Sequence, residues 1–313
     1  MVGGLGGLGR AISTYMVEHG ARNLIYLGRR SSQSDADQAF IGEHKSMGVD
    51  VITVRGKINE LDDVSRAVAE ARTPIKGVLQ LAAVQADENF ARLTKEQWDY
   101  SLGPKVTGTW NIHATAGIKL DFFLLFSSMS SVIGLPGHAN YASGNSFLDA
   151  FVQYRNNLGL ACSSIDIGPV AAVGFLSDRA VLLQTATLTG FKTLQEQEML
   201  DSIALSMIAK IPDSSKRAST FFDPNVFVLG LESTIPLSSP ANRAVWKKDH
   251  RMAIYHNDSG SAVDTAASSD QLKSYIANTR ADPAILKTPE AASYFAQEIG
   301  KRSLASCSRI IGT

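Results

Sequence analysis

A serine, a tyrosine, an asparagine and a lysine stand at spacings that suit acid–base chemistry. Tyr141 follows Ser128 by thirteen residues, Asn145 follows Tyr141 by four, and Lys105 lies upstream in a Pro-Lys-Val run. Residues four apart share one helix face, so Tyr141 and Asn145 are expected to point at the same site. A phenol beside an ammonium group and a hydroxyl is equipped to donate a proton. Each residue alone is a common packing or surface residue, and only their joint spacing indicates a site.

The first ten residues carry a second candidate site. Gly4, Gly6 and Gly9 match the G-x-G-x-x-G fingerprint of dinucleotide binding, and a helical pattern follows them directly. Glycine permits a tight turn and lets the backbone approach a pyrophosphate, while the helix N-terminus offers it free N–H groups. Glycine-rich turns also arise for purely steric reasons, so the motif alone leaves that alternative open.

Two arginines follow the next apolar stretch. Arg29 and Arg30 come about twenty residues after the glycines. Folds that prefer NAD usually have an acidic residue here for the ribose hydroxyls, whereas an arginine suits the additional 2′-phosphate of NADP. A guanidinium matches that dianion well. Both arginines could instead be solvated loop charges, but together with the glycines they favour NADP(H) as the cofactor.

The elements that must position these residues alternate along the first two thirds of the chain. Helical patterns separate five apolar stretches, which predicts an α/β fold with a doubly wound, Rossmann-like parallel sheet covered on both faces. The predicted strands are 23–28, 51–55, 77–83, 121–127 and 162–167, and the predicted helices are 7–19, 35–47, 60–72, 94–114 and 139–157. Ligands lie beyond the carboxyl ends of such strands, so Ser128 and Tyr141 can face one cleft.

The arrangement of the four residues resembles the ketoreductase domain of polyketide synthases, in the short-chain dehydrogenase/reductase superfamily. Ordinary members of that superfamily carry Tyr-x-x-x-Lys, whereas this subfamily exchanges the lysine and asparagine positions. Further segments look like the fungal, highly reducing type: GGLGGLGR, PIKGVLQLAAV, PKVTGTWNIH, SSIDIGPV and GLESTIPLSSPANRAVWKKDHRM. The resemblance covers about residues 1–257, which we expect to form one ketoreductase domain.

The resemblance implies a role for each of the four residues. Tyr141 donates a proton to the alkoxide that develops on a substrate carbonyl, and Ser128 hydrogen-bonds that oxygen. The ammonium of Lys105 lowers the pKa of the tyrosine from its usual value of about 10. Asn145 orders Lys105 or a water relay. NADPH supplies the hydride, and the implied reaction reduces a β-ketoacyl thioester to a β-hydroxyacyl thioester in polyketide biosynthesis.

Partners and a cofactor site are implied in the same way. The substrate is carried on the phosphopantetheine arm of an acyl carrier protein or domain, alongside other polyketide synthase domains. The expected cofactor-binding residues are Gly3, Gly4, Gly6, Gly7, Leu8, Gly9, Arg29, Arg30, Lys57, Ile58, Ala82, Ala83, Gly168 and Pro169. Asp87 corresponds, as a weaker signal, to an acidic position that steers product stereochemistry in some ketoreductases.

Two departures from the family pattern bear on activity. Only Met1 and Val2 precede the glycine turn where the family has a full strand, so we expect a truncated first strand, exposed apolar neighbours and a poorly anchored phosphate loop. Lys57 takes a position near the adenine that is usually aspartate or another small or polar residue. These departures predict poor stability and impaired activity. They keep a second function class open, a degenerate, non-catalytic ketoreductase fragment that acts as a nucleotide-binding or scaffold module.

The C-terminal part has a different pattern. Residues 258–270 are small and polar, as in a flexible linker, and residues 271–313 carry helical signals. The segment 289–306 resembles the first helix of an acyl carrier domain, but the chain has no Asp-Ser-Leu attachment site. We therefore expect short C-terminal helices in a truncated carrier-like tail that holds no acyl group of its own.

Composition argues against several other classes. Lys plus Arg and Asp plus Glu number 30 each, so net charge gives no reason to expect nucleic acid or an anionic membrane as a partner. No apolar run approaches the roughly 20 residues of a membrane helix. Two distant cysteines and scattered histidines give neither a disulfide framework nor metal-ligand spacing, so no metal is expected. A reducing, cytoplasmic location fits this cysteine usage best.

Overall fold

The chain folds as two compact units. The computed structural model describes residues 1–29, 34–116, 120–171, 190–208, 224–233, 239–240 and 242–249, and the single positions 237, 252, 275, 279 and 288. One unit comprises Met1–Leu183 and Thr193–Leu229, and the other Gln184–Lys192 and Gly230–Thr313. The first unit contains every predicted site residue. The predicted linker and nearly all of the predicted carrier-like tail lie outside the described residues, so both stay predictions.

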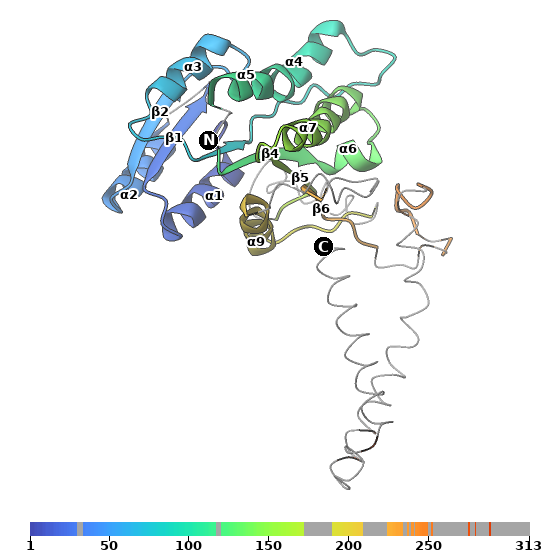
Figure 1. The fold of residues 1–313 in the computed structure, drawn as a ribbon. Coiled ribbons are helices and arrows are strands. Elements are labelled where there is room, and N and C mark those ends of the chain that lie inside the picture. Colours follow the sequence, from blue (N-terminus) through green and yellow to red (C-terminus); the bar gives the residue numbers. More distant parts are fainter. Residues whose placement is uncertain are drawn as a thin grey trace. The chain divides into compact units, whose positions relative to one another are not determined.

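Parallel strands form the centre of the first unit (Figure 1). They are β1 Asn23–Gly28, β2 Asp50–Arg55, β3 Gly77–Gln80, β4 Phe122–Ser128, β5 Ser163–Ile167 and β6 Val226–Leu229. β1 pairs with β2, and the other four pair in the order β3-β4-β5-β6, all in parallel. Val2 bridges Leu27 on one side and Gln80 on the other, which joins the two groups. The predicted parallel sheet is confirmed, and β6 is a strand that the sequence pattern did not predict.

Helices cover both faces of this sheet (Figure 1). They are α1 Gly7–Glu18, α2 Asp35–Ser46, α3 Leu61–Ala69, α4 Lys95–Lys105, α5 Thr107–Ala116, α6 Met129–Ile133, α7 Ala139–Asn157 and α9 Glu196–Met207. One face packs under α1 and α9, which bury Ile12 and Ile203. The opposite face packs under α3, α5 and α7, which bury Val64, Ile112 and Phe151. Covering both faces explains why the strands read as continuous apolar runs.

The predicted helix over 94–114 is two helices in the structure. α4 ends at Lys105 and α5 begins at Thr107, with Val106 between them. Pro104 lies in the last turn of α4 and has no N–H to donate to the helix. Its carbonyl accepts a 2.8 Å hydrogen bond from the Gln80 amide. The break leaves Lys105 at a helix end.

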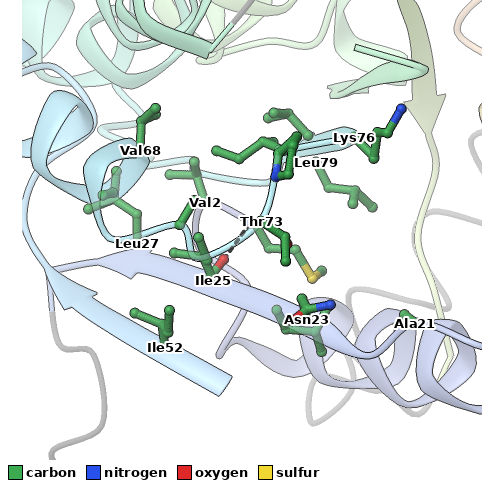
Figure 2. Close-up of a pocket in the computed structure, with 18 of the residues that line it drawn as sticks. Val2, Ala21, Asn23, Ile25, Leu27, Ile52, Val68, Thr73, Lys76 and Leu79 are labelled. Atoms are coloured by element: carbon green, nitrogen blue, oxygen red, sulfur yellow. Dashed lines mark hydrogen bonds between the residues drawn. The ribbon is translucent and has the colours of Figure 1, made fainter. Parts of the chain in front are cut away.

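An apolar cavity of about 380 Å³ lies between β1 and β3 (Figure 2). It is lined by the facing edges of both strands and by side chains such as Val68 of α3 and Ile112 of α5. Ile25 and Ile52 of β1 and β2 are only partly buried beside it. The cavity therefore lies within the sheet, between the two groups of strands that Val2 bridges.

The segment that precedes the glycine turn is nonetheless held on both sides. Leu27 N donates to the Met1 carbonyl at 3.0 Å, and Val2 N donates to the Leu79 carbonyl at 2.9 Å. Gly3 N donates to the Leu27 carbonyl at 2.9 Å. The expectation of a poorly anchored phosphate loop was thus wrong in this respect, because two strands hold these three residues as a short strand of their own.

Candidate active site

A second cavity opens at the carboxyl edge of the sheet. Its volume is about 770 Å³, and the glycine turn and the segments after β1, β2 and β3 line it. The predicted cofactor residues in its lining are Gly3, Gly4, Gly6, Arg29, Lys57, Ile58, Ala82 and Ala83. Gly7, Leu8 and Gly9 begin α1 beside it. Gly168 and Pro169 follow β5 and are not lining residues, and Arg30 lies outside the described part of the chain.

The glycines of the turn differ in what requires them. A Cβ on Gly4 would lie 2.7 Å from the Tyr26 ring, and a Cβ on Gly9 would lie 2.3 Å from the Gly4 carbonyl oxygen. Packing alone explains these two. A Cβ on Gly6 would meet nothing closer than 3.5 Å, and Gly6 lines the cleft just before α1 begins. Since a side chain there would fill the space at the helix N-terminus, the turn fits the diphosphate of a dinucleotide.

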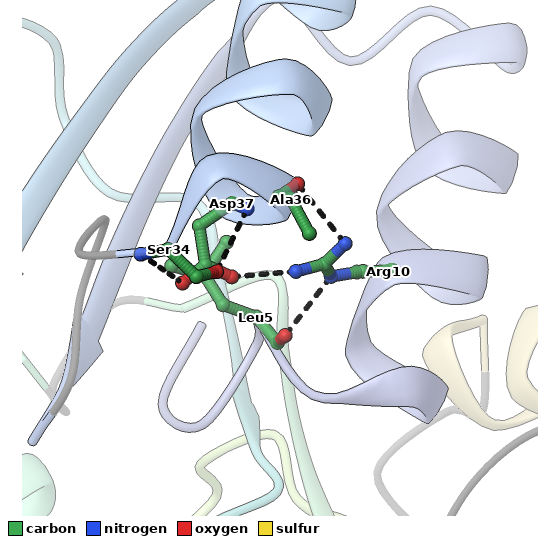
Figure 3. Close-up of polar contacts among 5 residues, drawn as sticks. All are labelled: Leu5, Arg10, Ser34, Ala36 and Asp37. Atoms are coloured by element: carbon green, nitrogen blue, oxygen red, sulfur yellow. Dashed lines mark hydrogen bonds and ion pairs between the residues drawn. The ribbon is translucent and has the colours of Figure 1, made fainter.

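Arg10 ties the glycine turn to the start of α2 (Figure 3). Its Nε donates to the Leu5 carbonyl at 3.1 Å, its Nη1 to the Ala36 carbonyl at 3.2 Å, and its Nη2 to Asp37 Oδ1 at 2.5 Å. Ser34 caps α2, because its hydroxyl accepts from Asp37 N at 3.1 Å. One guanidinium therefore fixes two walls of the cleft against each other.

Two exposed cationic side chains, Arg29 and Lys57, line the cleft. Arg29 follows β1, is exposed, and donates to the Tyr100 hydroxyl of α4 at 3.3 Å. Lys57 follows β2 and is also exposed, while its backbone N donates to Asp63 Oδ2 at 2.8 Å. Each cation can turn toward a phosphate in the cleft, so Lys57 adds positive charge where the sequence suggested a disturbed adenine site.

The predicted catalytic hydroxyls meet at the carboxyl end of β4. Ser128 ends β4 and caps α6, its Oγ accepting from Ser130 N at 3.2 Å. Tyr141 lies in the first turn of α7, and its hydroxyl interacts with the side chains of Ser128 and Asn145. The pairing of Ser128 with Ile167 in β5 puts Gly168 just beyond the same point. The structure thus brings Ser128, Tyr141 and Asn145 together.

Lys105 reaches this cluster from the end of α4. Its side chain is buried, 2% exposed, and its Nζ donates to the Phe126 carbonyl of β4 at 2.6 Å. The ammonium lies 5.8 Å from the centre of the Tyr141 ring. A Cβ on Gly144 would come within 3.2 Å of the lysine stem, so the glycine allows Lys105 to pass close to α7.

One expectation about this pair was wrong. Burial raises the pKa of Tyr141, and the hydrogen bonds from Ser128 and Asn145 only partly oppose that effect. The lowering expected from Lys105 does not prevail: burial dominates the shift, and the ammonium donates to the Phe126 carbonyl and lies 5.8 Å from the centre of the Tyr141 ring. Burial lowers the pKa of Lys105 itself to about 8, although Asp149 and Asp166 favour its charged form. Tyr141 is therefore a neutral phenol, able to donate a proton.

The hydrogen bonds of Asn145 go to α7 and to β4, and none goes to Lys105. Its Nδ2 donates to the Tyr141 carbonyl at 2.8 Å, and its own carbonyl accepts from the Ser127 hydroxyl at 3.4 Å. Its Oδ1 is buried and has no hydrogen-bond partner among the described residues. This acceptor is available for a water molecule, which leaves the predicted water relay open.

Asp87 lies on the outer side of Tyr141. One of its carboxylate oxygens is 3.8 Å from His138 Nε2, and its charge contributes to the raised pKa of Tyr141. The His138 and Tyr141 rings are 6.2 Å apart between centres. Asp87 is therefore close enough to influence the tyrosine electrostatically, and its role in stereochemistry stays a prediction.

Several residues that shape the cleft were not predicted from the sequence. They are Arg10, Tyr26, Ser34, Asp37, Gln80 and Tyr100. Gln80 carried a usable signal, since a glutamine inside a buried apolar strand needs partners. It is 0% exposed, donates to the Pro104 carbonyl, and accepts from Ala82 N at 2.8 Å. Gln80 thereby fixes the segment that holds Ala82 and Ala83.

The described residues contain neither a metal-ligand cluster nor a membrane-spanning helix. No group of three or more histidine, cysteine or acidic side chains there could hold a metal ion. Within the same part of the chain, no helix has the length and apolar character to cross a membrane.

Comparison with known proteins points to one family. The family model described as "KR domain" matches residues 1–172. The highly reducing polyketide synthase sphB of Aspergillus fumigatus is 50% identical over 316 residues, covering 96% of this chain and 13% of that protein. The highly reducing polyketide synthase lcsB of Purpureocillium lilacinum is 43% identical over 303 residues, covering 96% and 12%. The chain thus spans about an eighth of the length of these relatives.

Solved structures agree with the family match. A structure of A-type ketoreductases from a modular polyketide synthase is 27% identical, with a TM-score of 0.66. The match covers 74% of this chain and 47% of the solved chain.

Proposed function

Because this chain belongs to the KR domain family, we propose that it uses NADPH to reduce a β-ketoacyl thioester to a β-hydroxyacyl thioester in polyketide biosynthesis. The family and the fold imply a nicotinamide nucleotide, and the two cations at the cleft rim support NADPH over NADH. The observation that carries the proposal is the contact between the Tyr141 and Ser128 hydroxyls beside the buried Lys105.

Ser128, Tyr141 and Lys105 have different roles in the reduction of the substrate carbonyl. The nicotinamide nucleotide, when bound, supplies the hydride. Ser128 donates a hydrogen bond to the carbonyl oxygen and stabilises the negative charge that develops there. Tyr141 gives that oxygen its phenolic proton, which makes the product a neutral alcohol. The nearby Lys105 ammonium stabilises the tyrosinate that this transfer leaves behind.

The substrate and partners follow from the relatives. The relatives are highly reducing polyketide synthases, and this chain matches about an eighth of each. We propose that its substrate is carried by an acyl carrier protein or domain and that other polyketide synthase domains act on the same acyl chain. A cytoplasmic location belongs to the same proposal, since NADPH is abundant there.

The alternative of a non-catalytic module has less support. Burying an ammonium group costs several kcal/mol of free energy, and pairing it with opposite charges recovers only part of that cost. The chain nevertheless buries Lys105 beside a tyrosine. A scaffold that only binds nucleotide has no use for such a cation, whereas a proton donor does.

The proposal is tested by assaying the purified chain with a β-ketoacyl thioester of N-acetylcysteamine. NADPH oxidation should depend on the thioester, and mass spectrometry should find the β-hydroxy product. NADH should support a much lower kcat/KM. If the chain binds NADPH but gives no β-hydroxy product at any substrate concentration, the reductase assignment is wrong and the nucleotide-binding module takes its place.

Arg29 is expected to set the preference for NADPH. Replacing Arg29 with alanine should raise the KM for NADPH about tenfold and leave the KM for NADH nearly unchanged, because only NADPH has the 2′-phosphate that a guanidinium can bind. Steady-state kinetics with both nucleotides give the ratio. Tyr100→Phe is the matched control, since it removes only the 3.3 Å hydrogen bond of Arg29 to the protein. Equal losses with both nucleotides would assign Arg29 a structural role.

A further inference from the structure

Two acids, the fully buried Asp166 and the partly buried Asp149, lie beneath the catalytic cluster and have no part in the chemistry described above. Tyr141, Asn145 and Asp149 recur every four residues along α7, so they share one face of the helix. Asp166 lies in β5, where it pairs with Ser127 of β4, one residue before Ser128. Asp149 and Asp166 therefore meet directly under the site that holds Ser128 and Tyr141.

Serine hydroxyls surround both carboxyl groups. Ser131 Oγ donates to Asp166 Oδ1 at 3.0 Å, and Ser164 Oγ approaches Asp149 Oδ1 at 3.2 Å. Ser131 Oγ also lies 2.9 Å from the carbonyl of Ser128. A single hydroxyl thus connects Asp166 to the backbone of the candidate catalytic serine.

The second oxygen of Asp166 reveals the protonation state of the pair. Asp166 is 0% exposed, and its Oδ2 has no donor among the described residues if both acids are ionised. Ser164, whose hydroxyl donates to Asp149, lies two residues before Asp166 in β5, so both carboxyl groups reach the same face of that strand and interact with each other. A proton held between them supplies the missing donor. Burial raises the pKa of both acids, and the charge of Asp149 raises that of Asp166 further. With that shared proton in place, the pair carries a single negative charge.

Lys105 is the cation that faces this charge. Its ammonium is buried, and the two acids are the groups whose charges favour its protonated form. The other titratable groups around it are Tyr141, which is uncharged, and Asp87 with His138 on the outer side of that tyrosine. A buried ammonium without an opposite charge loses its proton readily.

We propose that Asp149 and Asp166 act together as one shared anion that keeps Lys105 protonated beneath Tyr141. The two acids are positioning residues that act through the lysine and never touch the substrate. This inference rests on the proposed reduction at Tyr141 for its consequence in catalysis, but the charge of Lys105 can be measured without any turnover.

If the two acids share one charge, the titration midpoint of Lys105 should respond differently to single and double substitution. Asp149→Asn or Asp166→Asn removes the shared proton with one acid, and the remaining carboxylate still carries a single negative charge opposite Lys105. Each single variant should therefore leave the titration midpoint of Lys105 near its starting value of about 8. The double variant removes the charge, and the midpoint should fall by about one pH unit or more.

NMR of protein labelled at lysine measures this directly, with the Lys105 Cε signal assigned through Lys105→Arg. Ser164→Ala is the matched control: it removes one hydrogen bond to Asp149 but no charge, so it should lower the melting temperature and leave the midpoint alone. An unchanged midpoint in the double variant overturns the proposal. A drop of about half a pH unit or more in both single variants shows two separate charges. That result also overturns the proposal, and it can be measured even where the double variant does not fold.

The pH dependence of kcat in the reductase assay is the second test of the proposal. In the wild type, kcat should fall as pH rises through the Lys105 midpoint, because the ammonium that stabilises tyrosinate is lost. In the double variant this alkaline limb should move to lower pH by the same amount as the NMR midpoint, with the KM for NADPH unchanged. If the NMR midpoint moves in the double variant but the wild-type chain reduces no thioester, the proposed function is rejected. The inference that the two acids share one charge opposite Lys105 is then still supported. An alkaline limb that stays in place while the NMR midpoint moves overturns the link to catalysis.

Discussion

Replacing Tyr141 with phenylalanine is expected to lower the rate of thioester reduction about a thousandfold and to leave NADPH binding intact. The phenylalanine ring keeps the packing against Lys105 and His138 but has no proton to give. The hydroxyl hydrogen bonds that are lost go to Ser128 and Asn145, neither of which lines the cleft that receives the nucleotide. Turnover of the thioester and fluorescence titration with NADPH measure the two properties separately.

A matched control is available on the same helix. Tyr154 lies near the other end of α7 and is 41% exposed, so Tyr154→Phe makes the same chemical change far from the site. That variant should keep wild-type kcat and KM. The backbone N of Tyr141 donates to Asn140 Oδ1 at 2.8 Å, a bond that the phenylalanine variant retains, so the start of α7 should stay folded. Substantial activity in Tyr141→Phe would show that another group donates the proton.

The sheet could be predicted because its strands follow one physical rule. Parallel strands covered on both faces are rich in apolar residues, and four of the five predicted strands, all except 162–167, are mostly apolar. β6 was missed because its run of four residues is short and lies among turns. Its strand character comes from pairing with β5, which the sequence pattern does not show.

The catalytic cluster was predictable only where spacing is local. Ser128 ends β4 and Tyr141 lies in the first turn of α7, with only the short helix α6 and a turn between them, so thirteen residues of sequence contain the geometry. The position of the Lys105 ammonium depends on the helix break after Pro104 and on the close approach at Gly144. Neither feature is visible in the Pro-Lys-Val run, which is why the effect of Lys105 on the pKa of Tyr141 was predicted wrongly.

The buried acid pair had a signal in the sequence that was not used. Asp166 lies between two isoleucines in the predicted strand 162–167, and acids are rarely buried completely unless something pairs with them. The identity of the partner could not be inferred, since Asp149 reads as an ordinary helix residue seventeen positions earlier. Pairing required the register that puts Asp166 beside Ser127 under α7.

The second large effect concerns the cavity between β1 and β3. Extending the chain by four apolar, β-branched residues placed directly before Met1 should raise the melting temperature by ~10 °C relative to an extension of glycine and serine. The backbone of Leu27 already pairs with Met1 and Gly3, and that of Leu79 pairs with Val2. Backbone groups alternate in direction along a parallel strand, so Asn23 and Gly77 present theirs toward the same gap.

Length and chemistry both suit such a segment. A strand rises about 3.3 Å per residue, so four residues span roughly 13 Å. The cavity lining extends back along β1 to Arg22 and along the approach to β3 to Lys76, where polar side chains can meet solvent. Between these ends the walls are apolar, and filling an apolar cavity of about 380 Å³ should add several kcal/mol to the free energy of unfolding.

An extension of the same length and similar apolarity with proline at two positions separates strand pairing from simple hydrophobic contact, because proline cannot donate to the ladder on either side. Calorimetry of the three extended chains gives the comparison, and hydrogen exchange at Val2 and Gly3 reports whether the pairing spreads to the glycine turn. The apolar extension should slow exchange there and the proline form should not. Equal melting temperatures for the apolar and glycine–serine forms would show that the cavity takes no strand. If the apolar extension raises the melting temperature, it should also tighten NADPH binding, because the glycine turn that holds the diphosphate begins where the added strand ends.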